Sequence, residues 1–366
     1  MIRALTLVTL AVLVSGVTVA QDDWSAAEFI ATAGVREAAV PVRELPGWRA
    51  NPTILLRPGI AEADALAAEF PGAEFITVEG PAELNAKAAE ADVILGYCTA
   101  AALAATTRLV WVQIYSSGAE RCLSVEETGG GKVLLTNMQK MSSPAIGEHA
   151  VAMALGLSRG LVRFGKAMPE GAWRRDLRSM PGVYSVSGKT MLVVGLGGIG
   201  SAAAQKGKAL GMRVIATRNS SREGPPWVDY VGLSDELDQL ISEADIVVNA
   251  LPLTESTAGL FDRALFAKMK RSAHFINVGR GKTVVTDDLV DALESGHIAG
   301  AGLDVTDPEP LPADHPLWQM PNVIITPHIS STGADRRFHR MLLRENIRRY
   351  LAGDALLNVV DPERGY

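Results

Sequence analysis

Short apolar runs alternate along the chain with stretches in which apolar residues recur at helical spacing, from about Thr53 onward. Apolar runs bounded by turn residues predict buried strands, and the stretches between them predict helices. Strand, helix and strand in succession are typical of βαβ units, whose strands lie parallel in one sheet. The predicted strands are Thr53–Leu56, Glu74–Thr77, Val93–Gly96, Val110–Ile114, Val133–Thr136, Met191–Val194, Arg213–Ala216, Ile246–Asn249, Phe275–Val278, Ala299–Leu303 and Val323–Thr326.

Two series of strands are separated by one long helical pattern, Ile146–Arg163, and by a segment with several Pro and Gly residues, Met168–Gly188. Such a segment indicates a passage between structural units. We therefore predict an α/β fold with two Rossmann-like domains, each built on a parallel sheet. The predicted parts are an N-terminal extension at 21–50, to which the pattern assigns no role, a discontinuous substrate domain at 51–146 and 331–366, and an inserted dinucleotide-binding domain at 147–330.

Residues 1–20 have a composition of their own. Arg3 precedes an apolar run, and Thr18-Val19-Ala20 places small residues directly before Gln21. A basic end, a short apolar core and a small-residue site are typical of a secretory signal peptide. We predict cleavage before Gln21, export to the periplasm, and no stable membrane insertion after cleavage. The alternatives are an uncleaved N-terminal membrane anchor and a cytoplasmic chain.

Composition narrows the function classes. Of 366 residues, 48% are hydrophobic and 21% charged, which is enough apolar material for two cores. The net charge is −6 and no Lys/Arg-rich block occurs, so we expect no nucleic-acid partner. The two cysteines, Cys98 and Cys122, are too few for a disulfide scaffold or a four-cysteine zinc site. We expect no metal, and one disulfide between these cysteines stays an open alternative.

A glycine-rich motif is the strongest single signal. Gly195-Leu196-Gly197-Gly198-Ile199-Gly200 follows a predicted strand and opens a helical pattern that stops at Gly211. In that context the glycines permit a tight turn, a close approach of backbone to pyrophosphate, and close packing of helix on strand. The free N–H groups at the start of the helix then favour phosphate. We expect this loop to bind a dinucleotide.

The next strand end indicates which dinucleotide. NAD-binding sites usually place a carboxylate there for the ribose 2′-hydroxyl. This chain instead has Thr217, Arg218 and, a few residues on, Arg222. Arginine can bind a 2′-phosphate that a carboxylate would repel. We therefore predict NADP as the preferred cofactor, with NAD as the alternative.

Three further motifs follow predicted strands in order: Asn277-Val278-Gly279-Arg280-Gly281, then Ala301-Gly302-Leu303-Asp304-Val305 with Glu309-Pro310, then Thr326-Pro327-His328. Together with the glycine-rich loop, and with Thr136-Asn137 and Glu148-His149 upstream, this set resembles the D-isomer-specific 2-hydroxyacid dehydrogenases of the glyoxylate/hydroxypyruvate reductase type. The resemblance runs from about Ala91 to Thr332. It implies a nicotinamide-dependent oxidoreductase.

The residue chemistry agrees with that resemblance. Reduction of a 2-oxo acid needs a cation for the carboxylate and a proton donor for the developing alkoxide. Arg280 suits the first role by bidentate contact, and His328 suits the second because imidazole changes its charge near neutral pH. Glu309 can hold the other ring nitrogen and favour the protonated ring. The three residues have these catalytic roles in the family as well.

Further positions are assigned by the resemblance. Leu251, Pro252, Thr257 and Val278 match residues that line the cofactor, and Asp304 matches a residue near its nicotinamide end. The resemblance also implies a homodimer.

On the substrate side, Ser117 and Gly118 lie in a loop that resembles the family's carboxylate-binding loop, although Ser116 and Ser117 replace glycines that are usual there. Tyr97, at another strand end, is expected to line the same cleft between the domains.

The predicted function is hydride transfer from NADPH to a small 2-oxo acid, such as glyoxylate or hydroxypyruvate, giving the D-2-hydroxy acid. Formate oxidation is disfavoured, because the related formate enzymes carry Gln where Glu309 stands. Two alternatives come from other classes. One is a non-catalytic NADP(H)-binding sensor on the same fold. The other is a serine hydrolase using Ser158 of a GxSxG pattern, which we interpret as chance because Ser158 lies within a helical pattern.

Overall fold

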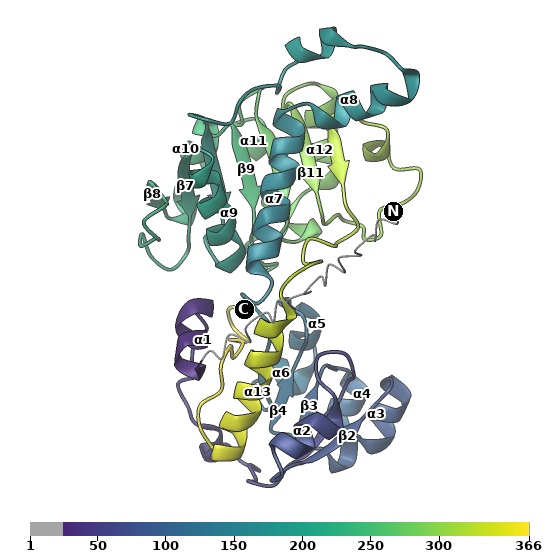
Figure 1. The fold of residues 1–366 in the computed structure, drawn as a ribbon, viewed down its shortest axis with the longest axis vertical. Coiled ribbons are helices and arrows are strands. Elements are labelled where there is room, and N and C mark those ends of the chain that lie inside the picture. The colour runs from purple at the N-terminus through teal and green to yellow at the C-terminus, as the bar shows by residue number, and fades with distance from the viewer. Residues whose placement is uncertain (1–24, 366) are drawn as a thin grey trace, which may run out of the picture.

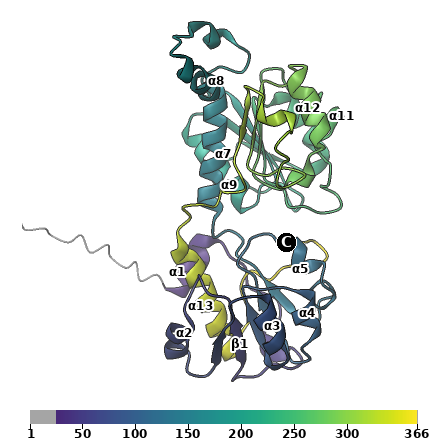
Figure 2. The same ribbon diagram turned by 90° about the vertical axis from the view of Figure 1, so that its right-hand side faces the viewer.

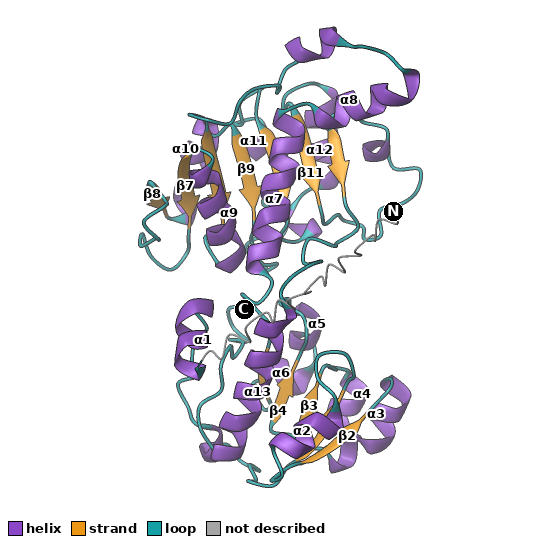
Figure 3. Cartoon of the chain, in the orientation of Figure 1, coloured by secondary structure: helices purple, strands orange, loops and turns teal. Residues whose placement is uncertain are grey.

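The computed structural model describes residues 25–365, and within that range the strands form two parallel sheets, of five and of seven strands (Figures 1 and 3). The sheets lie in separate lobes, joined where the chain enters helix α7 and where it returns to helix α13 (Figures 1 and 2). The predicted α/β class with two Rossmann-like units is therefore confirmed. The predicted signal peptide lies outside the described residues.

The first lobe contains the five-stranded sheet, in the order β2-β1-β3-β4-β5. Its strands are β1 (Thr53–Leu56), β2 (Glu74–Thr77), β3 (Val93–Leu95), β4 (Trp111–Gln113) and β5 (Leu134–Thr136). Its helices are α1 (Ala26–Ala33), α2 (Ala63–Glu69), α3 (Pro81–Lys87), α4 (Ala100–Ala104), α5 (Glu120–Leu123), α6 (Glu126–Gly129) and α13 (Arg336–Ala352).

The second lobe contains the seven-stranded sheet, in the order β12-β11-β10-β9-β6-β7-β8. Its strands are β6 (Thr190–Val194), β7 (Arg213–Thr217), β8 (Tyr230–Gly232), β9 (Ile246–Asn249), β10 (His274–Asn277), β11 (Gly300–Leu303) and β12 (Val323–Ile325). Its helices are α7 (Ser143–Ser158), α8 (Leu161–Ala167), α9 (Gly198–Ala209), α10 (Leu237–Glu243), α11 (Arg263–Phe266) and α12 (Thr286–Glu294).

The strand β6 shows why the central strands are continuous apolar runs. All five of its residues are buried. Leu192 and Val194 belong to one core cluster with residues of α10, α11 and α12, whereas Met191 and Val193 belong to another with residues of α7 and α9. Side chains alternate between the two faces of a strand, and helices cover both faces of this sheet. Both sets of positions must therefore be apolar.

The eleven predicted strands all occur, three with the predicted bounds and eight with ends that differ by one residue. Sequence reasoning missed the edge strand β8 (Tyr230–Gly232). This strand is short, and Tyr230 at its start is exposed. Only Val231 and Gly232 of its three residues are buried, and two residues are too few to stand out as an apolar run.

The prediction of one long helix over Ile146–Arg163 is wrong in one respect, because this segment forms two helices. α7 ends at Ser158, and α8 begins at Leu161. Between them Gly160 has φ +67°, a left-handed conformation that glycine adopts without strain. The apolar spacing continues across this break, so periodicity alone does not show it.

The segment before β1, to which the sequence assigned no role, is part of the first lobe. Ser25 caps α1 in a capping box with Glu28. Phe29 is buried and its ring centre lies 6.3 Å from that of Phe338 on α13. Farther along, the indole of Trp48 donates to the carbonyl of Tyr350 at 2.9 Å. The N-terminal segment and the C-terminal helix therefore stabilise each other.

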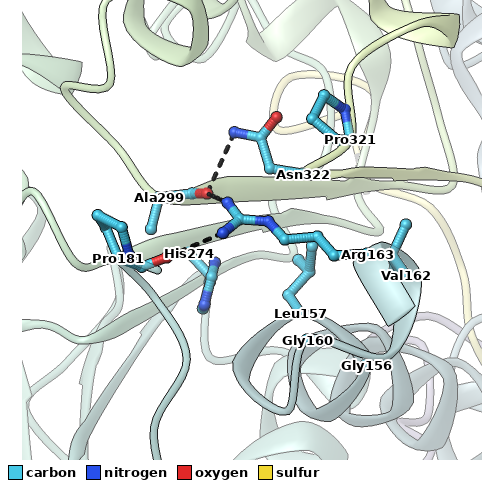
Figure 4. Close-up of a pocket in the computed structure, with 10 residues that line it drawn as sticks. All are labelled: Gly156, Leu157, Gly160, Val162, Arg163, Pro181, His274, Ala299, Pro321 and Asn322. Atoms are coloured by element: carbon cyan, nitrogen blue, oxygen red, sulfur yellow. Dashed lines mark hydrogen bonds between the residues drawn. The ribbon is translucent and has the colours of Figure 1, made fainter. Parts of the chain in front are cut away.

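A narrow pocket lies where the passage after α8 returns to the second sheet (Figure 4). The guanidinium of Arg163 donates to the carbonyls of Pro181 and Ala299, at 3.5 and 3.4 Å. Asn322 donates to the same Ala299 carbonyl at 3.1 Å. Ala299 and His274 stand at the amino ends of β11 and β10. Ligands of such sheets bind at the carboxyl ends, so this pocket lies on the opposite edge. Its contacts hold the segment after α8 against the sheet.

His274 in this pocket is expected to make the fold sensitive to acid. Burial lowers the pKa of His274 from 6.5 to about 4, and Nε2 lies 2.8 Å from the Gly182 carbonyl. Between pH 6.5 and 4, His274 is therefore protonated in the unfolded chain but still neutral in the folded protein. The free energy of unfolding consequently decreases as the pH falls from about 6.5 toward 4. The loss from this one group is about 3 kcal/mol. His274→Gln keeps a donor for Gly182 but does not titrate.

Chemical denaturation at several pH values tests this expectation. The free energy of unfolding of His274→Gln should fall less between pH 6.5 and 4 than that of the unaltered protein. His297→Gln, at a partly exposed position, serves as the control. Parallel pH profiles for His274→Gln and the unaltered protein would contradict the expectation.

Candidate active site

The site residues gather at the carboxyl edge of the second sheet. The chain runs from β6 outward to β7 and β8 on one side and from β9 to β12 on the other, so the order of strands reverses between β6 and β9. Ligands of doubly wound sheets bind at such a reversal. The loops that leave this edge are 195–200 after β6, 218–222 after β7, 250–257 after β9, 278–281 after β10, 304–309 after β11 and 326–330 after β12.

The glycine-rich loop has the shape of a phosphate cradle. Gly195 has φ +95°, and a Cβ there would lie 3.0 Å from the Leu251 side chain. A Cβ on Gly200 would overlap the carbonyl oxygen of Gly195. A Cβ on Gly197 would meet no atom within 4 Å, so this backbone is open to a ligand. Gly198 and Ile199 begin α9, whose N–H groups face the loop. These residues fit a pyrophosphate.

The strand end that is expected to bind the ribose has one available arginine. Arg222 is 2.7 Å from Glu236 and also donates to the Tyr230 hydroxyl, so its charge is compensated. Arg218 donates to the Glu223 carbonyl and has no carboxylate partner among residues 25–365. Thr217, the last residue of β7, is buried and only 4% exposed.

His328 and Glu309 are paired. The Nδ1 atom of His328 lies 2.7 Å from a carboxylate oxygen of Glu309. Both side chains are about half exposed, and within the described part of the chain Nε2 of His328 has no partner. A carboxylate on one ring nitrogen fixes the ring so that the other nitrogen faces outward. The arrangement suits proton transfer at Nε2.

Asp304 organises the loop that carries His328. Its carboxylate accepts hydrogen bonds from the N–H groups of Ile329 and Ser330 and from the Thr326 hydroxyl, while its carbonyl accepts from the His328 N–H at 2.8 Å. Burial by itself would raise the pKa of Asp304. The hydrogen bonds, with Ser330 and Thr326 foremost, outweigh burial and hold the pKa below its usual value. The side chain is 2% exposed, so its carboxylate acts through this loop.

A second histidine joins this network, and sequence reasoning had passed over it. Nε2 of His149 on α7 lies 2.9 Å from the Thr326 hydroxyl, which in turn donates to Asp304 at 2.7 Å. The order is therefore His149 to Thr326 to Asp304. The Glu148-His149 motif marks this position in the sequence, but a helical pattern alone gives it no role.

Arg280 lies where the two lobes meet. Its Nε donates to Glu120 of the first lobe at 2.8 Å, and its Nη1 donates to the Gly279 carbonyl at 2.7 Å. Its guanidinium also lies against Gly118, where any Cβ would clash with it. The structure therefore brings Gly118 and Arg280 together, as predicted. It adds Glu120, which directly follows the predicted loop and had no assigned role.

The other predicted substrate residues, Ser117 and Tyr97, form hydrogen bonds within the first lobe. The hydroxyl of Ser117 donates to the Met138 carbonyl, and that of Tyr97 donates to the Val78 carbonyl. Cys98 and Cys122 form a disulfide, with Cα atoms 5.6 Å apart. This bond joins the loop after β3 to α5 and answers the question that the sequence left open.

Buried polar side chains shape the loops after β9 and β10. Asn249 donates to the side chain of Asn277, and Asn277 donates to the Arg280 carbonyl. The hydroxyl of Thr257 donates to the Pro252 carbonyl at 2.7 Å. Thr257 and the predicted cofactor residue Val278 are buried, whereas Leu251 and Pro252 are partly exposed beside the glycine-rich loop.

Other chemistries find no support in the described residues. Ser158 is the last residue of α7, is fully buried, and donates to the Leu155 carbonyl, so it is no hydrolase nucleophile. Residues 25–365 contain no cluster of His, Cys, Asp or Glu that could hold a metal ion. In the same range no helix has the length and apolar character needed to cross a bilayer.

A doubly wound lobe with a phosphate cradle, beside an arginine and a histidine–carboxylate pair, defines a nicotinamide-dependent oxidoreductase. Comparison with known proteins gives the family. Residues 151–330 match the model of the D-isomer-specific 2-hydroxyacid dehydrogenase NAD-binding domain. The chain belongs to the D-isomer-specific 2-hydroxyacid dehydrogenase family, which confirms the predicted resemblance and enzyme class.

Individual relatives agree with this placement. A Corynebacterium melassecola protein from the proB 3′ region is 45% identical over 49% of this chain and 59% of its own length. Glyoxylate/hydroxypyruvate reductase B of Escherichia fergusonii is 36% identical over 65% of this chain and 74% of its own. The crystal structure of an NADPH-dependent glyoxylate/hydroxypyruvate reductase from Sinorhizobium meliloti, in complex with NADP and sulfate, has a TM-score of 0.74. It is 28% identical and covers 86% of this chain and 99% of its own.

Proposed function

We propose that the protein reduces a small 2-oxo acid, such as glyoxylate or hydroxypyruvate, with NADPH, forming the D-2-hydroxy acid. The observation that carries this proposal is the His328–Glu309 pair, with a contact of 2.7 Å, on the same sheet edge as Arg280 and the phosphate cradle. Two reductases with these substrates in their names are among the relatives.

Each residue has a defined task in this reaction. The bound cofactor supplies the hydride that reduces the carbonyl carbon. Arg280 binds the substrate carboxylate and polarises the carbonyl through the guanidinium N–H groups that Glu120 and the Gly279 carbonyl do not occupy, those of Nη2 foremost. His328 delivers a proton from Nε2 to the carbonyl oxygen as the C–O double bond becomes single. Glu309 holds the ring in place and stabilises its charged form.

NADP is the proposed cofactor because Arg218 has no carboxylate partner within residues 25–365. A 2′-phosphate would supply the missing negative charge. NAD would leave the charge of Arg218 without a counter-charge, so we expect weaker binding. The Sinorhizobium meliloti reductase is in complex with NADP.

The function is tested by following NADPH and NADH oxidation with the purified mature chain, residues 21–366. Glyoxylate, hydroxypyruvate, pyruvate and a bulky 2-oxo acid form the panel. We expect turnover of the small acids, faster with NADPH. Binding of NADPH without turnover of any 2-oxo acid would instead favour the sensor alternative.

We also propose a homodimer, formed through the segment that begins at α8. Leu161, Met168 and Trp173 are 62, 76 and 87% exposed, and the segment projects from the second lobe (Figure 2). Exposed apolar side chains gathered on one segment mark an interaction surface. A second copy related by twofold symmetry would cover them.

Light scattering after size exclusion tests the dimer. Trp173→Asp should give monomers at concentrations where the unaltered protein is dimeric, because it places a charge in the proposed contact. Trp318→Asp, at an exposed tryptophan on a different loop, should stay dimeric. A dimeric Trp173→Asp would contradict the assignment of this surface.

We further propose that the chain is exported and cleaved before Gln21. Disulfides persist in oxidising compartments such as the periplasm, and Cys98 and Cys122 are joined. Expression of the full chain should therefore give a periplasmic protein whose intact mass begins at Gln21, and Ala20→Arg should block cleavage. A protein that retains residues 1–20 in the cytoplasm would contradict export.

A further inference from the structure

Lys140 lies between the phosphate cradle and the N-terminal segment. It occupies the connection from β5 to α7 and has φ +73°. A Cβ on Gly198 would lie 3.0 Å from Cγ of Lys140, so the lysine stem packs directly on the glycine-rich loop. Its Nζ donates to the carbonyl of Gly34, at the end of α1. One lysine thus connects the proposed cofactor loop to a segment that precedes the first sheet.

Arg36 lies two residues after Gly34, and backbone hydrogen bonds fix its position. Its carbonyl accepts from the Asn358 N–H at 2.9 Å, and the neighbouring Glu37 forms a β-bridge with Leu357. The Arg36 side chain is exposed and has no hydrogen-bond or ion-pair partner in residues 25–365. The backbone is therefore anchored while the guanidinium is free to bind a ligand.

Arg36 and Arg218 both lie close enough to Lys140 for their charges to act on it. Burial lowers the pKa of Lys140, and the positive charges of Arg36 and Arg218 lower it further. Within residues 25–365 none of the three has a carboxylate partner; Lys140 and Arg218 donate only to the carbonyls of Gly34 and Glu223. Cations that face each other without a counter-ion repel, and an anion between them removes that repulsion.

We propose that Arg36 and Lys140 join Arg218 in binding the 2′-phosphate of NADP, so that the N-terminal segment helps to select the cofactor. The pyrophosphate is expected at the N–H groups where α9 begins, and the ribose at the end of β7, where Arg218 stands. Lys140 contacts the loop at Gly198 and interacts with Arg218, so it lies between these two positions. The proposal rests on the preference for NADP given above.

This arrangement couples the two lobes through the cofactor. Arg36 belongs to the first lobe, Arg218 to the second, and Lys140 to the connection between them. A phosphate dianion bound by all three would hold the lobes together on the side of the glycine-rich loop. The segment to which the sequence assigned no role would then contribute to the cofactor site.

The test is isothermal titration calorimetry with NADPH, NADH and 2′,5′-ADP, without any 2-oxo acid. Arg36→Gln should weaken NADPH and 2′,5′-ADP roughly fivefold, the effect of one partly exposed charge, and should leave NADH within about twofold. Lys140→Gln should show the same selectivity. Arg36→Lys, which keeps the charge, should retain most of the NADPH affinity.

Controls separate this proposal from simpler explanations. Arg271→Gln removes an exposed arginine just before β10, at the amino edge of the second sheet, and should change no affinity. Thermal melts confirm that each variant is folded. Equal weakening of NADPH and NADH by Arg36→Gln would overturn the proposal, because it would place the charge at the pyrophosphate. An unchanged NADPH affinity would overturn it as well.

Failure of the proposed reaction is a separate outcome. A protein that binds NADPH selectively through Arg36 but turns over no 2-oxo acid would disprove the reductase function and leave this site intact. A protein that reduces glyoxylate equally well with both cofactors, and binds both equally, would keep the reductase function and overturn the phosphate site.

Discussion

His328→Ala is expected to lower kcat about a thousandfold while leaving NADPH affinity unchanged. The imidazole is the group that can protonate the carbonyl oxygen, and general acid–base catalysis contributes roughly 10²–10⁴-fold. His328 lies at the end of β12, across the sheet from the glycine-rich loop after β6, so its removal should not disturb the cradle. Steady-state kinetics with glyoxylate and calorimetry with NADPH measure the two quantities.

A matched histidine and the paired carboxylate sharpen this test. His297→Ala removes a partly exposed ring that lies 3.0 Å from the Ala267 carbonyl, outside the site, and should keep full turnover. Glu309→Gln should lower kcat less than His328→Ala, because the amide can still hold the ring by a hydrogen bond but supplies no negative charge beside it. Normal turnover by His328→Ala would refute the catalytic assignment.

Arg280→Met is expected to cause the second large loss, about a hundredfold or more in kcat/KM. The guanidinium is the cation that the structure places against the Gly118 loop. A charge-assisted bidentate contact contributes a few kcal/mol. Each ~1.4 kcal/mol corresponds to a tenfold change in kcat/KM. KM should rise because the substrate carboxylate loses its partner. kcat should fall because the carbonyl is no longer polarised. Kinetics over a wide range of glyoxylate concentration separates the two effects.

Arg213→Met is the control for the loss of an ion pair. Arg213 is 2.7 Å from Glu243, a pair similar to Arg280 with Glu120, but it begins β7 at the amino edge of the sheet. Its substitution should leave kcat/KM within about twofold. If Arg280→Met retained KM and kcat, the substrate carboxylate would have to bind elsewhere.

Much of the fold was predictable because its signals are local. A strand covered on both faces must be apolar at every position, as β6 shows, and such runs are visible without any contact information. The exceptions have a local cause as well. Gly160 ends α7 by a backbone angle that leaves the apolar spacing intact, and β8 is too short and too exposed to form a run.

The site was predictable in its residue types and in its place at strand ends. The glycine-rich loop, Arg280, Asp304, Glu309 and His328 all follow strands of one parallel sheet, so their meeting at one edge follows from topology. The hydrogen-bond partners that these residues find in distant parts of the chain could not be predicted from the sequence. That Asp304 lies near the nicotinamide stays a prediction, but the sequence did not show that its buried carboxylate holds the His328 loop.

The sequence by itself determined the class of fold, the dinucleotide loop and the residues able to move a proton and bind a carboxylate, because these depend on local pattern and on strand ends. Only the tertiary structure decided which side chains meet across the lobes. Glu120 on Arg280, His149 on Thr326, and Lys140 on the Gly34 carbonyl are contacts between residues separated by long stretches of chain. Such contacts depend on how the sheets and connections pack, and no local spacing encodes them.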